Sequence, residues 1–405
     1  MIAAVSILSL VASVLGNPVP SSLETRQSCN INSLSSVAAA EKCSTITIDA
    51  FTVPAGQKFV INALDRATIN MNGNVVFAAD ATFKTTGPLF TLTGNNITFN
   101  GHGFTIDGQG AKYWDGLGTS PNAKQAKPHP MIKLSCSGTV ENVKVLNSPA
   151  QVFSMGNNAR LIVSNINIDN CKHDEFGLYA CKPAAHNTDG FDGTFGSIRG
   201  VKAFADSVIV STNDVTIQGS TIVNQDDCIA INKGSNINFL NNHCTGGHGI
   251  SVGSIASGSV VSTVRITGNT ITNNVQALRI KTDANATRYA VRPVVNEAHA
   301  DRGSSGSVSD VTYSGNTATG CTSYGVIIDQ SYPDTLGPNP GAGVKISGIT
   351  FTGTNTIAVA SSAKGEVEVN CAKGGCTGVW DWAGLKVSGG PSGTILNANI
   401  INFKQ

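Results

Sequence analysis

The stretch from residue 215 to residue 266 repeats one short theme three times: Val215-Thr216-Ile217, Ile237-Asn238-Phe239 and Val264-Arg265-Ile266. In each segment apolar residues alternate with another residue, which is the period of a strand buried on one face. The first step along the repeat is 22 residues and the second is 27 residues. A repeat in the twenties with strand-like content is typical of a solenoid, in which each coil stacks on the one before.

The same theme continues in both directions along the chain. It occurs upstream at residues 96–100 (Asn-Ile-Thr-Phe-Asn), 143–147 and 163–168, and downstream at residues 311–313, 47 residues after Val264. We interpret that longer step as two turns of the solenoid. Asn or Gly follows many of the segments; Asn tolerates a left-handed backbone and can bond to its counterpart in the next coil.

We therefore predict an all-β fold, a parallel β-helix. A β-sandwich would show hairpin turns about every ten residues, and a propeller would show a blade signature; neither pattern is visible. Residues 31–42 form the one convincing helix, with Leu34, Val37 and Ala38 at helical spacing. We expect this helix to cap the open end of the strand stack.

The composition and the N-terminus indicate the compartment. Residues 1–16 are predicted to be a signal peptide, residues 17–26 a pro-segment that ends at Arg26, and residues 27–405 a single β-helix catalytic domain. No other run is long and apolar enough to cross a bilayer. The net charge of +1 gives no bulk attraction to nucleic acid or to an anionic membrane. We expect a secreted monomer.

Ten cysteines in a secreted chain imply disulfides. The natural close pairs are Cys29/Cys43, Cys171/Cys181, Cys228/Cys244 and Cys371/Cys376. Cys136 and Cys321 would then form a distant pair or remain as two buried thiols. The sequons at Asn96 and Asn285 allow glycosylation.

Charged residues gather in four motifs although only 13% of the chain is charged. The motifs contain Asp189, the adjacent pair Asp226 and Asp227, His248, and the basic pair Arg279 and Lys281. In a β-helix, residues one coil apart lie about 4.8 Å apart, so these side chains would form a ladder on one face. Taken singly, each motif has a plainer interpretation: a solvated turn, a structural His in a Gly-rich turn, or basic residues on a strand face.

The four motifs, in this order, resemble those of fungal endopolygalacturonases of glycoside hydrolase family 28, with a basidiomycete-like C-terminus. The matching segments are residues 187–192 (Asn-Thr-Asp-Gly-Phe-Asp), 225–228 (Gln-Asp-Asp-Cys), 246–249 (Gly-Gly-His-Gly), 279–281 (Arg-Ile-Lys), and 323–326 leading to 330–333. The resemblance covers nearly the whole mature chain and includes residues 105–110 and 113–116. It implies a right-handed β-helix and inverting hydrolysis within a galacturonate polymer.

The resemblance also implies a role for each site residue. Asp226 is the expected general acid, with His248 bonded to it, while Asp189 and Asp227 hold and deprotonate the water. Three clustered acids repel one another, so one of them should retain its proton at mildly acidic pH. Arg279 and Lys281 would bind the carboxylate of a uronic acid. Tyr324 would contact a sugar, with a buried core tyrosine as the alternative.

Further expectations follow from the same family. It suggests the disulfides Cys29–Cys43, Cys228–Cys244 and Cys371–Cys376. The substrate would be polygalacturonate, and inhibitor proteins of plants are candidate partners. We expect no cofactor and no metal, since no second His or Cys lies at ligand spacing beside His248. Extra residues near 170–185, 193–207 and 283–304 are either loops that reshape the cleft or translated introns.

Three other functions remain open from sequence alone. An exo-polygalacturonase or a rhamnogalacturonase of the same family would differ in its products. A pectate lyase would require acids that bind Ca²⁺ and an arginine base. A β-solenoid that only binds the cell wall would release no reducing sugar.

Overall fold

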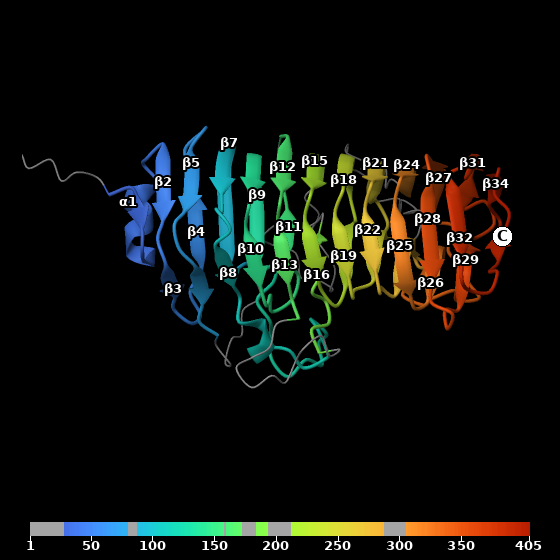
Figure 1. Ribbon diagram of the computed structural model, residues 1–405, viewed down its shortest axis with the longest axis horizontal. Coiled ribbons are helices and arrows are strands. Elements are labelled where there is room, and N and C mark those ends of the chain that lie inside the picture. The colour runs from blue at the N-terminus through green and yellow to red at the C-terminus, as the bar shows by residue number, and fades with distance from the viewer. Residues whose placement is uncertain (1–27, 80–86, 158, 172–183, 193–211, 287–304) are drawn as a thin grey trace, which may run out of the picture.

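The strands of the chain stack side by side along one long axis, from α1 at one end to the C-terminus at the other (Figure 1). The structure, a computed structural model, describes residues 28–79, 87–157, 159–171, 184–192, 212–286 and 305–405. One coil contains three strands, for example β17 (Asp227–Ile231), β18 (Gly234–Leu240) and β19 (His243–Thr245). Each strand pairs in parallel with its counterpart one coil later. This is the predicted right-handed parallel β-helix.

Within the described residues, the strands form one sheet of 21, one of 11 and one of two. Besides β17 and β18, the first sheet contains β1 (Asn30–Ile31), β2 (Thr45–Ile48), β4 (Phe59–Asn62), β5 (Thr68–Met71), β7 (Phe90–Asn100), β9 (Ile132–Glu141), β11 (Phe153–Met155), β12 (Leu161–Ser164), β14 (Phe191–Asp192), β15 (Thr212–Gln218), β20 (Gly249–Ile255), β21 (Val260–Thr267), β23 (Gln276–Asp283), β24 (Gly306–Ser314), β26 (Tyr324–Tyr332), β27 (Val344–Thr352), β29 (Gly365–Asn370), β30 (Cys376–Thr377) and β33 (Ile395–Leu396).

The two other sheets complete the coils. Besides β19, the second sheet contains β3 (Phe51–Val53), β6 (Val75–Phe77), β8 (Thr105–Asp107), β10 (Lys144–Leu146), β13 (Asn167–Asp169), β16 (Thr221–Val223), β22 (Thr270–Thr272), β25 (Thr317–Cys321), β28 (Asn355–Val359) and β32 (Leu385–Ser388). The small third sheet pairs β31 (Val379–Asp381) with β34 (Asn399–Ile401) at the C-terminal end.

The predicted repeat corresponds to the register of the coils. Val215 pairs with Ile237, and Ile237 pairs with Val264. The interpretation of the next step was wrong, because Val264 pairs directly with Val311. The 47 residues between them therefore form a single coil that carries a long insertion, not two turns.

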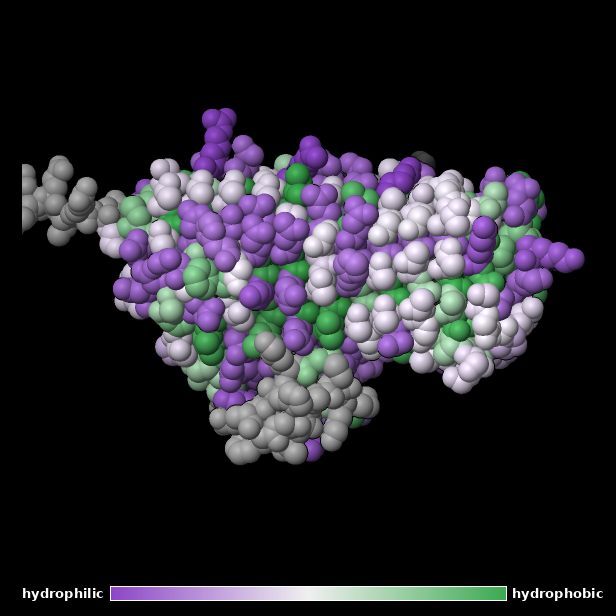
Figure 2. All heavy atoms as spheres, viewed as in Figure 1, coloured by the Kyte–Doolittle hydropathy of each residue, from purple (hydrophilic) through white to green (hydrophobic). Residues whose placement is uncertain are grey.

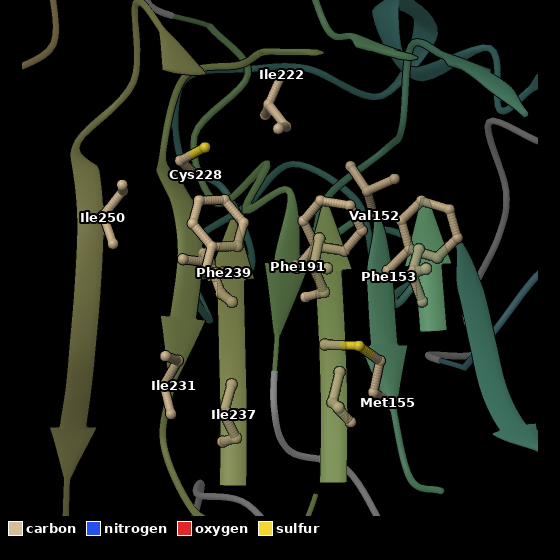
Figure 3. Packing of buried hydrophobic residues seen from close by; sticks show 14 of the residues in the cluster. Val152, Phe153, Met155, Phe191, Ile222, Cys228, Ile231, Ile237, Phe239 and Ile250 are labelled. Carbon is tan, nitrogen blue, oxygen red and sulfur yellow. The ribbon is translucent and has the colours of Figure 1, made fainter. Parts of the chain in front are cut away.

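The interior of each coil is packed with apolar side chains that stack on the same kind of residue in the next coil. The rings of Phe153 and Phe191 stack with centroids 5.2 Å apart, and both side chains are buried among those drawn in Figure 3. Complete burial of one such side chain contributes about 1.5–3 kcal/mol. Because side chains alternate along a strand, the apolar residues of each repeat fill this core and their neighbours point outward.

A buried column of asparagines lines one corner of the later coils. The backbone N–H of Asn242 donates to the side-chain Oδ1 of Asn269. The same backbone-to-side-chain bond links Asn269 to Asn316 and Asn316 to Asn355. All four side chains are fully buried. The preceding residue Asn241 has a φ of 54°. The predicted roles of asparagine at the corners, a left-handed backbone and a bond to the next coil, are both confirmed.

The N-terminal helix is shorter than predicted. Residues 31–42 were expected to be helical, but Ile31 belongs to β1, and the helical part consists of a 3₁₀ helix, η1 (Leu34–Ser36), and one α-helical turn, α1 (Val37–Ala40). Pairing of β1 with β2 draws the start of the segment into the sheet. The Cys29–Cys43 disulfide closes the segment, which lies at the end of the strand stack as predicted.

The other cysteine predictions can be compared with the structure. The pairs Cys228–Cys244 and Cys371–Cys376 are bonded. Cys136 and Cys321 are buried free thiols and do not form the distant pair that was the other alternative. Cys171 is disulfide-bonded, and Cys181 lies outside the described residues.

The surface carries the predicted sequons, and most of the face in Figure 2 is hydrophilic or neutral, with hydrophobic residues visible between the polar ones. Asn96 and Asn285 are both exposed, and their glycosylation stays a prediction. Among the described residues, no helix has the length and apolar character needed to span a bilayer. The predicted signal peptide and pro-segment, residues 1–26, lie outside the described residues.

Candidate active site

Coil stacking brings the predicted motifs onto neighbouring strands. Asp227 begins β17, which pairs in parallel with β20, and β20 pairs with β23. Ser251 on β20 lies beside Arg279 on β23, two residues before Lys281. Asp189 precedes β14, the strand on the other side of β17. Residues that are distant in the sequence therefore meet on one face, as predicted.

Asp227 is the electrostatic centre of the group. Its side chain is fully buried. One oxygen accepts hydrogen bonds from Arg279 Nη2 at 2.6 Å and from Ser251 Oγ at 2.7 Å, and the other accepts from Lys281 Nζ at 2.8 Å. Burial alone would raise the pKa of this carboxyl, but the charges of Arg279 and Lys281 outweigh burial and hold the pKa far below its usual range. Asp227 is therefore ionised.

Asp226 has different partners from its neighbour. Its Oδ1 lies 3.0 Å from Nδ1 of His248, and its Oδ2 accepts the backbone N–H of Asn187 at 3.0 Å. His186 lies on the Oδ2 side, with Nδ1 at 3.9 Å. Burial raises the pKa of Asp226, whereas the hydrogen bond with His248 lowers it, and the result is a pKa below the ordinary value.

Asp189 shows the opposite shift. Its side chain is only 8% exposed. Burial raises its pKa well above the ordinary value, and the nearby charges of Asp226, Asp227 and Asp192 raise it further. The prediction that one clustered carboxyl keeps its proton is therefore supported, and among the protein groups themselves that carboxyl is Asp189 rather than Asp226.

These side chains line one cavity of about 240 Å³. Asp189, Asp226, His248, Arg279 and Lys281 all contribute to its wall, whereas Asp227 supports the cations from beneath. Arg279 and Lys281 are 14% and 12% exposed, so both reach the cavity while they neutralise Asp227. The cavity combines a carboxyl whose pKa is raised, a carboxyl whose pKa is lowered and cationic donors, a set of groups suited to acid–base hydrolysis of an anionic substrate.

A tyrosine contributes to the cavity, but it is not the predicted one. The ring of Tyr332 lies in the wall, with its centroid 5.2 Å from Nζ of Lys281. Tyr324, at the start of the same strand, is buried and does not line the cavity. The predicted contact between Tyr324 and a sugar stays untested. Both tyrosines lie in the fifth matching motif, so the sequence contained the signal without deciding between them.

Three further residues of the site were not predicted. His186, directly before the Asn-Thr-Asp motif, is half-exposed and lines the cavity. Gln151 lines it as well, and within the described residues its buried Oε1 atom has no hydrogen-bond partner. Ser251 binds Asp227 and also accepts a bond from Nε of Arg279. Neither Gln151 nor Ser251 lies in one of the charged motifs, so no signal in the sequence pointed to them.

The expected absence of a metal stays a prediction. Potential ligand atoms of Asp226, Asp227 and His248 lie within 4.8 Å of one another. Both oxygens of Asp227 already bind cationic side chains, and Oδ1 of Asp226 is bonded to His248. The predicted extra segments near residues 170–185, 193–207 and 283–304 lie largely outside the described residues.

Comparisons with known proteins agree with this geometry. Residues 43–403 match the family model of glycosyl hydrolases family 28. The chain is 36% identical to an endo-polygalacturonase of Sclerotinia sclerotiorum, over 89% of this chain and 83% of that protein. It is also 36% identical to a polygalacturonase of Saccharomyces cerevisiae, over 95% and 94% of the two chains.

One solved structure is similar along almost its whole length. Endopolygalacturonase I from Stereum purpureum, complexed with two galacturonate molecules, superposes with a TM-score of 0.77 at 43% sequence identity, and covers 92% of this chain and 98% of its own. The family match, the similar sequences and the shared fold agree, and this chain belongs to family 28 of the glycosyl hydrolases.

Proposed function

We propose that this protein is a polygalacturonase that hydrolyses α-1,4-galacturonosidic bonds within polygalacturonate and so degrades plant pectin. The observation that carries the proposal is the facing arrangement of Asp189 and Asp226 with Arg279 and Lys281 in one cavity. A neutral sugar would offer these cations no anionic partner, whereas each galacturonate unit carries a carboxylate.

The carboxyl groups divide the work of hydrolysis. Asp226 protonates the leaving oxygen and Asp189 deprotonates the attacking water, which gives inversion at the anomeric carbon. A contact of Asp227 with the same water stays a prediction, because its side chain lies beneath the cations. His248 bonds to Asp226 and adjusts its protonation. The fixed hydrogen bonds from Ser251 and Arg279 keep Asp227 oriented and charged throughout.

Substrate binding would favour the protonated forms of both Asp226 and Asp189, because the charge of Lys281 lowers the pKa of each. On its own, the protein favours a proton on Asp189 and a charge on Asp226. A galacturonate carboxylate bound to Arg279 and Lys281 would cancel part of the positive charge that now keeps Asp226 ionised, and would add a negative charge beside it. Both changes raise the pKa of Asp226. The protons belong to the coupled group, so occupancy can move between its members without a change in their number.

The remaining residues support binding. Arg279 offers a planar fork to a carboxylate and Lys281 a point charge. Tyr332 supplies a ring face next to Lys281 for the apolar face of a sugar, and Tyr324 remains a second candidate. The galacturonate complex of the Stereum purpureum relative supports this class of ligand. We also propose secretion, a monomeric state and binding by plant inhibitor proteins.

Product analysis on polygalacturonate tests the proposed function. Endo action should release mixed oligomers and lower the viscosity of the solution rapidly, whereas exo action would release mainly monomer. Products that absorb in the ultraviolet would indicate a lyase, and activity on rhamnogalacturonan alone would indicate the other branch of the family. No reducing ends from any of these polymers would refute an enzymatic role.

A further inference from the structure

We propose that the buried ion pair between Asp115 and Lys127 positions the catalytic acid: it holds the segment between β8 and β9 against Asn187, whose backbone N–H is held in turn on Asp226. Neither member of the pair lines the cavity. The inference rests on the proposed function in so far as Asp226 is the acid of that reaction.

Both side chains of the ion pair are buried, and each makes further hydrogen bonds. Nζ of Lys127 lies 2.7 Å from Oδ1 of Asp115, and the two side chains are 1% and 5% exposed. Lys127 also donates to the carbonyl oxygen of Gly118. The carboxylate of Asp115 accepts the backbone N–H groups of Leu117 at 2.9 Å and Lys124 at 2.8 Å. These bonds fold residues 115–127 around one buried charge pair, in a segment without regular strands that projects from the stack (Figure 1).

The segment folded in this way touches the motif that carries Asp189. The backbone N–H of Gly116 donates to the carbonyl oxygen of Ala184 at 2.9 Å, and the N–H of Thr119 donates to Oδ1 of Asn187 at 3.0 Å. Gly118 has a φ of +55°, and a Cβ atom at this position would lie 2.0 Å from Oδ1 of Asn187. The backbone of the segment therefore lies directly against the Asn187 side chain.

Asn187 transmits the contact to the acid. Its φ of 61° lies in the left-handed region, which asparagine tolerates, and hydrogen bonds hold the residue from both sides. Its side chain is bound by Thr119, and its own N–H donates to Oδ2 of Asp226 at 3.0 Å. The adjacent Ala184 and Ala185 donate their N–H groups to Oε1 of Gln225, the residue before Asp226.

Loss of the ion pair should therefore affect chemistry more than substrate binding. A donor that moves away from Oδ2 no longer stabilises the charged form of Asp226, so the pKa of Asp226 should rise. The charged or titratable groups that face Asp226 from other elements, His248, Asp227 and Lys281, stay in place. His186 and Asp189 lie on the loosened segment itself. The cations that bind substrate are anchored on a different strand, β23, and should be unaffected.

Two variants break the link at different points. Lys127→Met removes the charge that organises the segment, and Gly118→Ala pushes the segment away from Asn187 without a change in the ion pair. Each has a matched control. Arg265→Met removes the cation of an ion pair whose side chains are 37% and 51% exposed. Gly103→Ala introduces a Cβ at a φ of +77° with no heavy atom within 4 Å.

We expect kcat on polygalacturonate to fall about ten-fold or more in Lys127→Met and Gly118→Ala, with KM within about two-fold of wild type. The basic limb of the kcat/KM profile should shift to higher pH. Hydrogen–deuterium exchange of the intact protein should be faster in the peptide that spans residues 184–190 and unchanged in residues 249–255. The controls should resemble wild type in all of these measurements.

The proposal is overturned if both variants keep kcat within about two-fold of their controls. It is also overturned if kcat falls while the basic limb of the pH profile and the hydrogen–deuterium exchange of residues 184–190 stay unchanged, because that result would indicate a general structural effect. The exchange measurement needs no substrate. An inactive wild-type protein would therefore refute the proposed function, while the exchange data would still decide whether the ion pair holds Asn187.

Discussion

Replacement of Lys281 by methionine tests the electrostatic design of the site most directly. Lys281 Nζ lies 2.8 Å from Oδ2 of Asp227, whose side chain is fully buried. Methionine keeps the length and most of the apolar stem of lysine but removes the charge. Arg279 and Ser251 still bind the other oxygen of Asp227, so the carboxylate loses one of its two cations and remains partly compensated.

The magnitude follows from the charged hydrogen bond that is lost. Such a bond contributes about 1.5–3 kcal/mol to stability, so we expect Lys281→Met to lower the free energy of unfolding by about 2 kcal/mol at pH 7. The folded-state pKa of Asp227 is depressed, so its stabilisation is present above the unfolded pKa of about 3.9. That stabilisation is lost as the pH falls toward the folded pKa. The unfolded states of wild type and variant are alike, so the difference between them shrinks only as the pH approaches the folded-state pKa of Asp227, which is less depressed in the variant.

Urea unfolding at pH 7 and at pH 3 measures this difference. The matched control is Arg265→Met, in which the lost ion pair is exposed to solvent and should contribute at most about 1 kcal/mol. A smaller loss of stability at pH 3 than at pH 7 would show that Asp227 of the folded variant is partly protonated at pH 3 and that the effect is one of charge. No loss at pH 7 would refute the view that Lys281 neutralises Asp227.

Four further predictions concern activity. Asp226→Asn should abolish hydrolysis while circular dichroism stays unchanged, because the amide cannot protonate the leaving oxygen; retention of more than a few per cent of activity would remove Asp226 from the acid role. Lys281→Ala should raise KM for oligogalacturonates about ten-fold or more, and an unchanged affinity would contradict the carboxylate contact. His248→Gln should lower kcat and shift the basic limb of the kcat/KM profile to higher pH, since the bond from His248 lowers the pKa of Asp226; a limb that stays in place would exclude this role. Wild type should have an acidic optimum, and a flat rate between about pH 4 and pH 8 would contradict it.

The strand register could be predicted where the repeat is regular and not where it is interrupted. Val215, Ile237 and Val264 lie one coil apart because each is the inward residue of an alternating pair. Between Val264 and Val311 the coil carries an insertion as long as another coil. Sequence spacing cannot distinguish a long loop from an extra turn, because both add residues without a change in the alternation of the flanking strands.

The short N-terminal helix illustrates the same limit. Leu34, Val37 and Ala38 have helical spacing, but the residues before them also have the alternation needed to extend a sheet. The backbone of Ile31 pairs with Ile48 in the first sheet, and a hydrogen-bonded neighbour in the sheet outweighs a weak local propensity. Local patterns therefore identified the helix, whereas its length was set by a strand that follows it in the sequence.

The membership of the site was largely predictable, because type and order of the residues are properties of the sequence. The choice between Tyr324 and Tyr332 was not. Both lie on β26, eight positions apart, and regular alternation would place them on the same face. The register between β23 and β26 shifts between Asp329 and Tyr332, and such an irregularity can re-aim a side chain. It is not visible in the sequence.

The protonation pattern depends even more on three-dimensional contacts. Asp226 and Asp227 are adjacent, chemically identical and both buried, yet one bonds to His248 on the next coil and the other to Arg279 and Lys281 on the coil after that. Oxygen atoms of the two carboxyls lie within 4.8 Å of each other, so the unequal pKa values come from these partners and not from separate locations. Asp189 has burial and negative neighbours without a cation bonded to it within the described residues, and it therefore has the raised pKa. A glycoside hydrolase needs one protonated and one ionised carboxyl. In this fold the carboxyls differ in pKa because their hydrogen-bond partners lie on different coils.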